Sequence, residues 1–266
     1  MLRLAVVGKD VSKSDSPAIH RYILGKLGVE CSYERISVSP AEFSASAGEL
    51  FHKFDAFNVT IPFKGEIIPF LNDLRGDARR FGAVNTVVSD TRTGYNTDGD
   101  GFLLMLKNED MGLKNRRVLV LGAGGAGRSC IAKLRDEGAN VFAFERNAER
   151  LLEVCREIGG FQPLDKLLLE PFDVIVNATG VGMHDTVGQS PVSKELIELS
   201  KMAVDLIYVP RESEFLKIAR ELGKKTVNGA AMLFYQAYFA DCIYLNRQPA
   251  AAEAKLLWQG FSEENE

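Results

Sequence analysis

A short apolar run that ends in a glycine-rich turn constrains the fold of this chain more than any other feature. Val118-Leu119-Val120-Leu121 has the composition of a buried strand, and Gly122-Ala123-Gly124-Gly125-Ala126-Gly127 follows it directly. In such a turn the first glycine permits the tight bend, the second lets backbone amides approach a pyrophosphate, and the last permits close packing of the following helix. The N-terminus of that helix favours a bound anion.

The sequence after the turn supplies the context that an isolated glycine motif lacks. Helix-compatible residues follow Gly127, and a second strand-like run, Val141-Phe142-Ala143-Phe144, lies at the spacing of a β-α-β unit. An ordinary glycine turn would not require a strand before it and a β-α-β unit around it. The sequence therefore predicts a Rossmann-type, doubly wound domain in which residues 122–127 bind a dinucleotide.

The residues after the second run bear on the choice between NAD and NADP. Glu145 ends the run, where an acidic side chain usually binds the ribose diol of NAD. Arg146 and Arg150 follow, and on the first turn of a helix both guanidinium groups could face a ribose 2′-phosphate. Arg150 could equally be a solvated surface residue. These residues leave both nucleotides open.

The length of the chain and the order of its expected elements indicate two domains. At 266 residues it exceeds the size at which one core usually stops growing. Strand-like runs alternate with helical patterns on both sides of a polar stretch, Lys107 to Arg117, which we interpret as the link between domains. We expect residues 1–103 with 238–266 to form a substrate-binding and catalytic domain of mixed or parallel α/β type, and residues 104–237 to form the nucleotide-binding domain.

The periodicity of apolar residues places the individual elements. In the first domain we expect strands at 2–8, 32–38, 55–61, 84–89 and 93–96, and helices at 16–28, 41–52 and 64–73. In the second we expect strands at 117–121, 140–145, 172–177, 202–207 and 225–228, and helices at 125–137, 147–158 and 213–222. The final helices, at about 229–245 and 250–260, should pack back on the first domain.

Composition and spacing argue against several classes of function. The net charge of −4 gives no reason to expect nucleic acid or an anionic membrane as a partner. The longest apolar runs are far shorter than the ~20 residues of a membrane span, and no secretory signal is evident. The 4 cysteines are scattered, which favours free thiols, and His20, His52 and His184 lack a metal-ligand spacing. We therefore expect a cytoplasmic protein without a metal, as a monomer or homodimer.

The segment from Asn58 to Lys64 has the pattern of a strand that builds a site. Alternate side chains of a strand share a face, so Asn58 and Thr60 should point together. Pro62 cannot donate to a central ladder and should end the pairing, which leaves Lys64 free to reach across a cleft. An edge strand with a solvated lysine would give the same pattern.

The sequence contains two other polar clusters, and each lies at an expected junction between a strand and a helix. They are Ser14 with Ser16, and Asn85 with Asp98. Junctions at the carboxyl ends of strands in an open α/β sheet converge on one crevice. Individually, Ser16 and Asp98 could be helix caps and Asn85 a turn residue.

Taken together, the polar clusters suit a small polyol acid. Hydroxyls of Ser14 and Ser16 can receive a carboxylate, and amide groups of Asn58, Asn85 and Gln236 can bracket hydroxyls. Lys64 beside Asp98 could exchange a proton with an alkoxide that forms as hydride arrives from the cofactor. The sequence lacks a G-x-S-x-G elbow and a Walker-type loop, so hydrolase and kinase functions have no support.

Over nearly its whole length the chain resembles the shikimate/quinate dehydrogenase family. The resemblance is carried by an ordered set of motifs: Ser14-Asp15-Ser16-Pro17-Ala18-Ile19-His20, Asn58-Val59-Thr60-Ile61-Pro62-Phe63-Lys64, Ala83-Val84-Asn85-Thr86, Asn96-Thr97-Asp98-Gly99, residues 122–127, Asn177-Ala178-Thr179, Asp205-Leu206-Ile207-Tyr208, and Asn228-Gly229-Ala230-Ala231-Met232-Leu233 with Gln236.

This resemblance implies reversible, NADPH-dependent reduction of 3-dehydroshikimate to shikimate, in the synthesis of aromatic amino-acid precursors. It implies Lys64 and Asp98 as the catalytic pair, and further substrate contacts from Ser14, Ser16, Thr60, Asn85, Tyr208 and Gln236. It also implies that Asn177, Ala178, Thr179, Gly229 and Met232 contact the cofactor.

One segment departs from the family pattern. NADP-specific members commonly read Asn-Arg-Thr-x-x-Arg after the second strand, whereas this chain reads Glu145-Arg146-Asn147-Ala148-Glu149-Arg150. The carboxylate of Glu145 should repel a 2′-phosphate, but two arginines should outweigh it. We expect NADP, with NAD as a possible second nucleotide. Quinate oxidation with NAD, or a non-catalytic dinucleotide-dependent sensor, are the alternatives.

Overall fold

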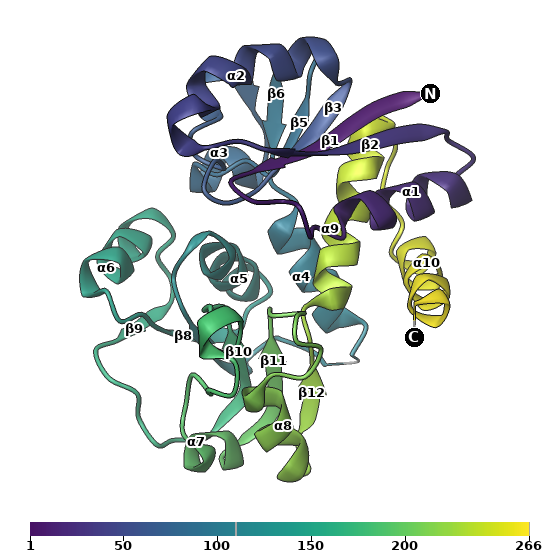
Figure 1. Ribbon diagram of the computed structural model, residues 1–266. Helices are drawn as coiled ribbons and strands as arrows, with labels where there is room; N and C mark the ends of the chain where they lie inside the picture. Colours follow the sequence, from purple (N-terminus) through teal and green to yellow (C-terminus); the bar gives the residue numbers. More distant parts are fainter. Residues whose placement is uncertain (110, 266) are drawn as a thin grey trace. The chain divides into compact units, whose positions relative to one another are not determined.

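A computed structural model describes residues 1–109 and 111–265 of the chain (Figure 1). Asp110, in the expected link, and Glu266, at the end of the expected first domain, lie outside the described residues. Contacts between residues divide the chain into two compact units. Unit 1 comprises Met1–Gly101 and Phe234–Glu266, and unit 2 comprises Phe102–Leu233.

Unit 1 is built on a mixed sheet with the strand order β2-β1-β3-β5-β6-β4. β1 pairs in parallel with both β2 and β3, whereas β5 is antiparallel to β3 and to β6. This confirms the α/β class expected for the first part of the chain. The strands are β1 (Leu2–Gly8), β2 (Cys31–Ser37), β3 (Ala56–Val59), β4 (Asp73–Leu74), β5 (Thr86–Val88) and β6 (Thr93–Tyr95).

Side chains alternate along β1, so both faces of the sheet carry apolar residues, and helices cover both faces. Ala5 and Val7 pack into one cluster with Phe43 of α2, and Leu4 and Val6 pack into another with Leu24 of α1. The helices of this unit are α1 (Ser16–Lys26), α2 (Pro40–Lys53), α3 (Asp77–Phe81) and α10 (Ala251–Glu264), with the short 3-10 helix η1 (Ile68–Phe70). The C-terminal helix α10 lies beside α1 (Figure 1).

The helix expected over residues 64–73 is wrong. Hydrogen-bonded turns follow Thr60, and η1 and β4 occupy the rest of the segment. Gly65 has poor helix propensity, and Pro69 lacks the amide that a helix interior needs. Lys64 therefore lies in a turn, where its carbonyl oxygen accepts a hydrogen bond from the amide of Val84 at 2.8 Å.

Unit 2 is a doubly wound sheet in which neighbouring strands run parallel, in the order β12-β11-β10-β7-β8-β9. Numbered along the chain from β7, this is the order 3-2-1-4-5-6 of a dinucleotide-binding fold, read from the β9 edge, so the Rossmann expectation is confirmed. The strands are β7 (Arg117–Leu121), β8 (Asn140–Phe144), β9 (Gln162–Leu164), β10 (Phe172–Asn177), β11 (Ser200–Asp205) and β12 (Lys225–Val227).

The helices of unit 2 close its apolar core. Phe215 of α8 and Leu196 of α7 pack with Leu119 and Ile175 of the central strands, while α5 contacts β7 and β8. These helices are α5 (Gly125–Asp136), α6 (Ala148–Glu157), α7 (Lys194–Glu198) and α8 (Glu214–Glu221), with the 3-10 helix η2 (His184–Thr186). Two further helices, α4 (Asp98–Lys107) and α9 (Ala230–Tyr244), each contribute residues to both units.

The sequence did not reveal four short elements, which are β4, β9, α3 and α7. Cys31, Cys130, Cys155 and Cys242 are free, as expected. Among the helices of residues 1–109 and 111–265, none combines the length and apolar character that crossing a membrane requires.

Candidate active site

Polar side chains from three parts of unit 1 meet at one edge of its sheet. β1, β3 and β6 share a direction and β5 opposes them, so the carboxyl ends of the first three strands and the amino end of β5 lie together. Lys64 follows β3, Asp98 follows β6, and Asn85 immediately precedes β5. Asn85 therefore reaches this edge through an antiparallel strand, and not through the carboxyl-end junction that the sequence suggested.

Lys64 and Asp98 form an ion pair at this edge. The Nζ atom of Lys64 lies 2.5 Å from Oδ2 of Asp98. Their side chains are 22% and 11% exposed, so both are largely shielded from solvent but not fully enclosed. The backbone amide of Asp98 donates to Oδ1 of Asn96 at 3.0 Å, which fixes the start of α4 and hence the carboxylate.

Asn85 holds the other oxygen of Asp98. Its Nδ2 donates to Oδ1 of Asp98 at 2.8 Å and lies 3.2 Å from Oε1 of Gln236. Its Oδ1 accepts hydrogen bonds from the amide of Thr97 at 2.9 Å and the hydroxyl of Thr86 at 2.8 Å. Because both acceptor positions are used, the amide cannot turn without breaking these bonds. Asn85 is thus a rigid donor to Asp98, and it brings Gln236 of α9 to the same edge.

Ser14 lies in the loop between β1 and α1, and Ser16 is the first residue of α1. Their hydroxyls are 3.1 Å apart, and the backbone amide of Ser16 lies 3.3 Å from the hydroxyl oxygen of Ser14. Arg35 of β2 donates from Nε and Nη2 to the carbonyl oxygen of Ser14 at 2.9 and 2.7 Å. The guanidinium of Arg35 therefore anchors the serine loop, a role that the sequence did not indicate.

The remaining residues expected at the substrate are divided between the units. Thr60 is half-buried directly after β3, and its amide donates to the carbonyl oxygen of Val7 at 2.9 Å. Tyr208 belongs to unit 2, in the segment after β11, and is half-buried. Lys64, Asp98, Asn85, Ser14, Ser16, Thr60 and Gln236 all belong to unit 1.

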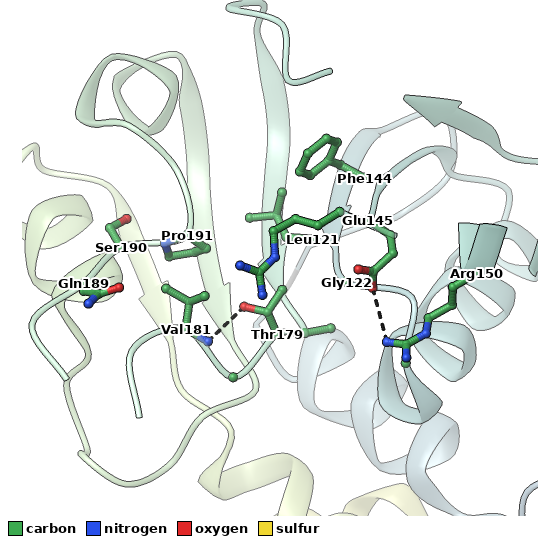
Figure 2. A pocket seen from close by; sticks show the side chains of 14 residues that line it. Leu121, Gly122, Phe144, Glu145, Arg150, Thr179, Val181, Gln189, Ser190 and Pro191 are labelled. Carbon is green, nitrogen blue, oxygen red and sulfur yellow. Dashed lines mark hydrogen bonds and ion pairs between the residues drawn. The ribbon is translucent and has the colours of Figure 1, made fainter. Parts of the chain in front are cut away.

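Unit 2 carries a cavity of about 440 Å³ at the carboxyl ends of β7, β8 and β10 (Figure 2). Because β8 follows β7 on one side and β10 lies on the other, this is the point at which the strand order reverses, where open α/β sheets bind ligands. The lining residues are Leu121, Gly122, Gly124, Phe144, Glu145, Arg146, Arg150, Ala178, Thr179, Gly180, Val181, Gln189, Ser190 and Pro191.

The glycines of the turn fit a dinucleotide. Gly122 has a φ of +93°, which favours glycine, and a Cβ on Gly127 would overlap the carbonyl oxygen of Gly122. A Cβ on Gly124 would meet nothing within 4 Å, so this position has open space for a pyrophosphate. Gly125 and Ala126 begin α5, whose N-terminus supplies backbone amides, and Ala123 is fully buried beneath the turn.

Glu145 is held against the glycine turn by backbone amides. Its Oε2 accepts from the amide of Ala123 at 3.0 Å, and its Oε1 accepts from the amide of Asn147 at 3.2 Å. Burial alone would raise the pKa of Glu145, but these hydrogen bonds and the charge of Arg150 outweigh it, so the pKa lies below its usual value. The carboxylate is therefore charged at neutral pH and fixed at the rim of the cavity.

Arg146 and Arg150 lie beside this carboxylate. Nη1 of Arg150 is 3.9 Å from Oε2 of Glu145, and its side chain is 51% exposed, so the guanidinium can turn toward a ligand (Figure 2). Arg146 lines the same cavity and is exposed. Asn147 caps α6, because its side chain accepts a hydrogen bond from the amide of Arg150 at 3.1 Å.

Asn177 shapes the cavity from beneath. It is fully buried, its Oδ1 accepts from the hydroxyl of Thr179 at 2.6 Å, and its Nδ2 donates to Oδ1 of Asp205 at 3.0 Å. Ala178 and Thr179 line the cavity, whereas Asn177 does not. Asn177 is therefore placed to position the loop after β10.

Gly229 and Met232 lie at the start of α9, within unit 2. A Cβ on Gly229 would overlap the carbonyl oxygen of Leu206, so this position requires glycine, and Met232 is 8% exposed.

The sequence also missed Gln189, Ser190 and Pro191, which complete the cavity wall. They lie in irregular chain between β10 and α7, where no periodic pattern marks a site.

In the described parts of the chain, no group of three or more His, Cys, Asp or Glu side chains could hold a metal.

Two family models match the chain. One, described as the substrate binding domain of shikimate dehydrogenase, covers residues 6–87, and the other, described as shikimate / quinate 5-dehydrogenase, covers residues 105–218. The first range contains Lys64 and Asn85, and the second contains the glycine turn.

Individual proteins are similar over almost the whole length. A shikimate dehydrogenase (NADP(+)) of Thermus thermophilus is 39% identical over 252 residues, covering 94% of each chain. The structure of shikimate 5-dehydrogenase from Thermus thermophilus, in complex with NADP(H) and shikimate, has a TM-score of 0.86 at 36% identity, covering 97% of this chain and 98% of that one. Shikimate 5-dehydrogenase from Listeria monocytogenes, in complex with shikimate and NAD, has a TM-score of 0.83 at 26% identity, with 97% and 96% covered.

Proposed function

This chain belongs to the shikimate/quinate dehydrogenase family, and we propose that it is an NADP-dependent shikimate dehydrogenase in which Lys64 and Asp98 transfer the proton of the reaction. The observation that carries this proposal is the ion pair between Nζ of Lys64 and Oδ2 of Asp98 at 2.5 Å, on a carboxylate whose other oxygen is held by Asn85. A charged donor fixed in this way is what an alkoxide requires.

The reaction needs one hydride and one proton. The reduced nicotinamide supplies the hydride to the carbonyl carbon of 3-dehydroshikimate. As negative charge develops on the carbonyl oxygen, the ammonium of Lys64 donates a proton to it, which yields the hydroxyl of shikimate. Asp98 orients the ammonium and stabilises its charge. In the direction of oxidation, Lys64 takes the proton from the hydroxyl.

The rest of the edge suits the other groups of the substrate. The paired hydroxyls of Ser14 and Ser16, with Arg35 anchoring their loop, are proposed to bind the carboxylate. Thr60, Asn85 and Gln236 are proposed to bind the ring hydroxyls, which the hydrogen bond between Asn85 and Gln236 supports. Tyr208 of unit 2 is proposed as an additional contact to the carboxylate.

For the nucleotide, the open turn at Gly124 is proposed to receive the pyrophosphate at the start of α5. Arg146 and Arg150 are proposed to bind the 2′-phosphate of NADP, for which guanidinium groups have suitable geometry. Ala178 and Thr179 are proposed to line the cofactor, positioned by Asn177, and Gly229 and Met232 to lie at its nicotinamide.

A second candidate is oxidation of quinate or shikimate with NAD. The fixed carboxylate of Glu145 favours it, since an acid at the end of the second strand binds the ribose diol of NAD in many related folds. Two arginines against one carboxylate favour NADP. A non-catalytic sensor is the least supported alternative, because a sensor does not need the Lys64–Asp98 pair.

A matrix of two acids and two nucleotides tests these candidates. We expect the highest kcat/KM for shikimate with NADP. A higher kcat/KM for quinate with NAD would favour the second candidate, and tight nucleotide binding without turnover of either acid would favour the sensor.

We also propose that the protein is cytoplasmic and is a monomer or a homodimer. Four free cysteines are consistent with a reducing compartment. Cell fractionation tests the location, and light scattering of the purified protein tests the oligomeric state.

A further inference from the structure

Tyr33 and Asn58 form a buried hydrogen bond across the sheet of unit 1. The hydroxyl of Tyr33, in β2, donates to Oδ1 of Asn58, in β3, at 2.7 Å. β1 lies between these strands, so the phenol reaches over it on the face that also carries Leu4 and Val6. Tyr33 is 3% exposed and Asn58 is 6% exposed. Polar groups this deeply buried depend on their partners for orientation.

The hydrogen bonds continue from Asn58 to the proposed catalytic pair. Because Oδ1 of Asn58 faces Tyr33, its Nδ2 faces the other way and donates to the carbonyl oxygen of Asn85 at 3.1 Å. The same Nδ2 lies 3.4 Å from Oγ1 of Thr86, and the Thr86 hydroxyl donates to Oδ1 of Asn85 at 2.8 Å. With Oδ1 of Asn85 thus occupied, its Nδ2 faces Asp98. One continuous run of donors and acceptors therefore leads from Tyr33, through Asn58, to Asn85 and Asp98.

The ring of Tyr33 is fixed independently of its hydroxyl. It stacks on the imidazole of His20, with centroids 4.7 Å apart and planes at 21°. Nδ1 of His20 lies 2.6 Å from Oδ1 of Asp241, and both side chains are fully buried. Removing only the hydroxyl of Tyr33 therefore interrupts the run while the ring stays in place.

We propose that Tyr33 is a positioning residue for the dehydrogenase reaction, whose hydroxyl sets the orientation of the Asn58 and Asn85 amides and thereby of the Asp98 carboxylate. This inference rests on the proposed function. Without the hydroxyl, Oδ1 of Asn58 loses its donor, the Asn58 amide is released to turn, and the Thr86 hydroxyl is no longer directed at Asn85.

The test is Tyr33→Phe, with Tyr238→Phe as a matched control. Tyr238 is also fully buried in unit 1, but its hydroxyl hydrogen bonds to Glu253 at 2.8 Å, outside the run. We expect Tyr33→Phe to lower kcat/KM for shikimate about tenfold, which is the effect of losing one hydrogen bond in a network that ends on a charged group. The KM for NADP should not change. Tyr238→Phe should lower the melting temperature and leave both kinetic constants at the wild-type values.

A double-mutant comparison separates positioning from general damage. If Tyr33 acts through Asn85, then Tyr33→Phe added to Asn85→Ala should cause less additional loss of kcat than it causes alone. Asn58→Ala interrupts the run at its middle and should reproduce the kinetic loss, which keeps the test valid if Tyr33→Phe folds poorly.

Three results would overturn the inference: wild-type kcat/KM in both Tyr33→Phe and Asn58→Ala, an equal loss in Tyr238→Phe, or full additivity with Asn85→Ala. A wild-type protein without shikimate-dependent turnover would instead refute the proposed function, and the inference with it. An active wild type with unaffected Tyr33→Phe and Asn58→Ala variants would refute the inference alone.

Discussion

Asn85 and Lys64 bind opposite oxygens of one carboxylate: Nδ2 of Asn85 donates to Oδ1 of Asp98 at 2.8 Å, and Nζ of Lys64 lies 2.5 Å from Oδ2. Asp98 can therefore orient the ammonium without rotating. The amide of Asn85 acts on the lysine through this carboxylate, so a change at Asn85 should affect turnover and not only substrate binding.

Asn85→Ala tests that relationship. Loss of the donor frees Oδ1 of Asp98 and removes a hydrogen bond to a charged group, so kcat should fall at least about tenfold. Assays at saturating shikimate and NADP give kcat directly. Asn72→Ala is the control, since Asn72 bonds through Nδ2 to the carbonyl oxygen of Thr91 in an exposed setting. Equal kcat in the two variants would show that Asn85 does not position the pair.

Glu145→Gln should shift nucleotide preference toward NADP. The wild-type carboxylate is charged at neutral pH because backbone hydrogen bonds and Arg150 hold its pKa below the usual value against the effect of burial. Glutamine removes the repulsion of a 2′-phosphate, and we expect the ratio of kcat/KM for NADP to that for NAD to rise about tenfold. Glu149→Gln, on the exposed first turn of α6, should leave the ratio unchanged. A lower ratio in Glu145→Gln would contradict this assignment.

Arg150→Ala should have the opposite effect. If this half-exposed guanidinium binds the 2′-phosphate, its loss should raise the KM for NADP about tenfold and leave the KM for NAD nearly unchanged. Arg156→Ala, in the last turn of the same helix, is the matched control. An equal rise in both KM values would indicate a general effect on the cavity instead of recognition of the phosphate.

Asp173→Asn should change the acid stability of unit 2. Burial tends to raise the pKa of Asp173, but hydrogen bonds from Lys201 and the amide of Arg117, with the charge of Arg116, hold it below its usual value. A carboxyl group with a lowered folded pKa stabilises the protein above its unfolded pKa of about 3.9, and this stability is lost as the pH falls through the folded pKa.

The expected result is a difference in the free energy of unfolding, between variant and wild type, that depends on pH. Asp173→Asn should lower the free energy of unfolding at pH 7, and its difference from wild type should narrow as the pH is lowered below about 4. Urea titrations at several pH values measure this. Asp165→Asn, at an exposed position of the same unit, should show little difference at any pH. A constant difference for Asp173→Asn across the range would contradict the assignment.

The elements with long, regular patterns were the ones that sequence predicted well. β7, the glycine turn and α5 follow from a buried apolar run and from glycines whose close approaches exclude a Cβ. The segment 64–73 failed because its apolar spacing resembled a helix, while Gly65 and Pro69 opposed one. Spacing alone did not reveal this conflict.

For the candidate site, the sequence predicted which types of residue lie together, but not how the fold brings them together. Lys64 and Asp98 were paired correctly in space, but the route of Asn85 to them depends on β5 being antiparallel, which alternation of strands and helices does not encode. Arg35 and Gln189 were missed because their roles depend on tertiary placement: one binds a carbonyl oxygen across the sheet, and the other lies in irregular chain.

The central claim is tested most directly by Lys64→Ala, measured for shikimate oxidation at saturating NADP together with the Kd for NADP. We predict that kcat falls by about 10² or more, since general acid–base catalysis typically contributes that much, while the Kd for NADP stays at the wild-type value. Lys26→Ala, which removes an exposed lysine elsewhere in unit 1, should retain full activity. A Lys64→Ala variant with kcat close to that of the wild type would contradict the account.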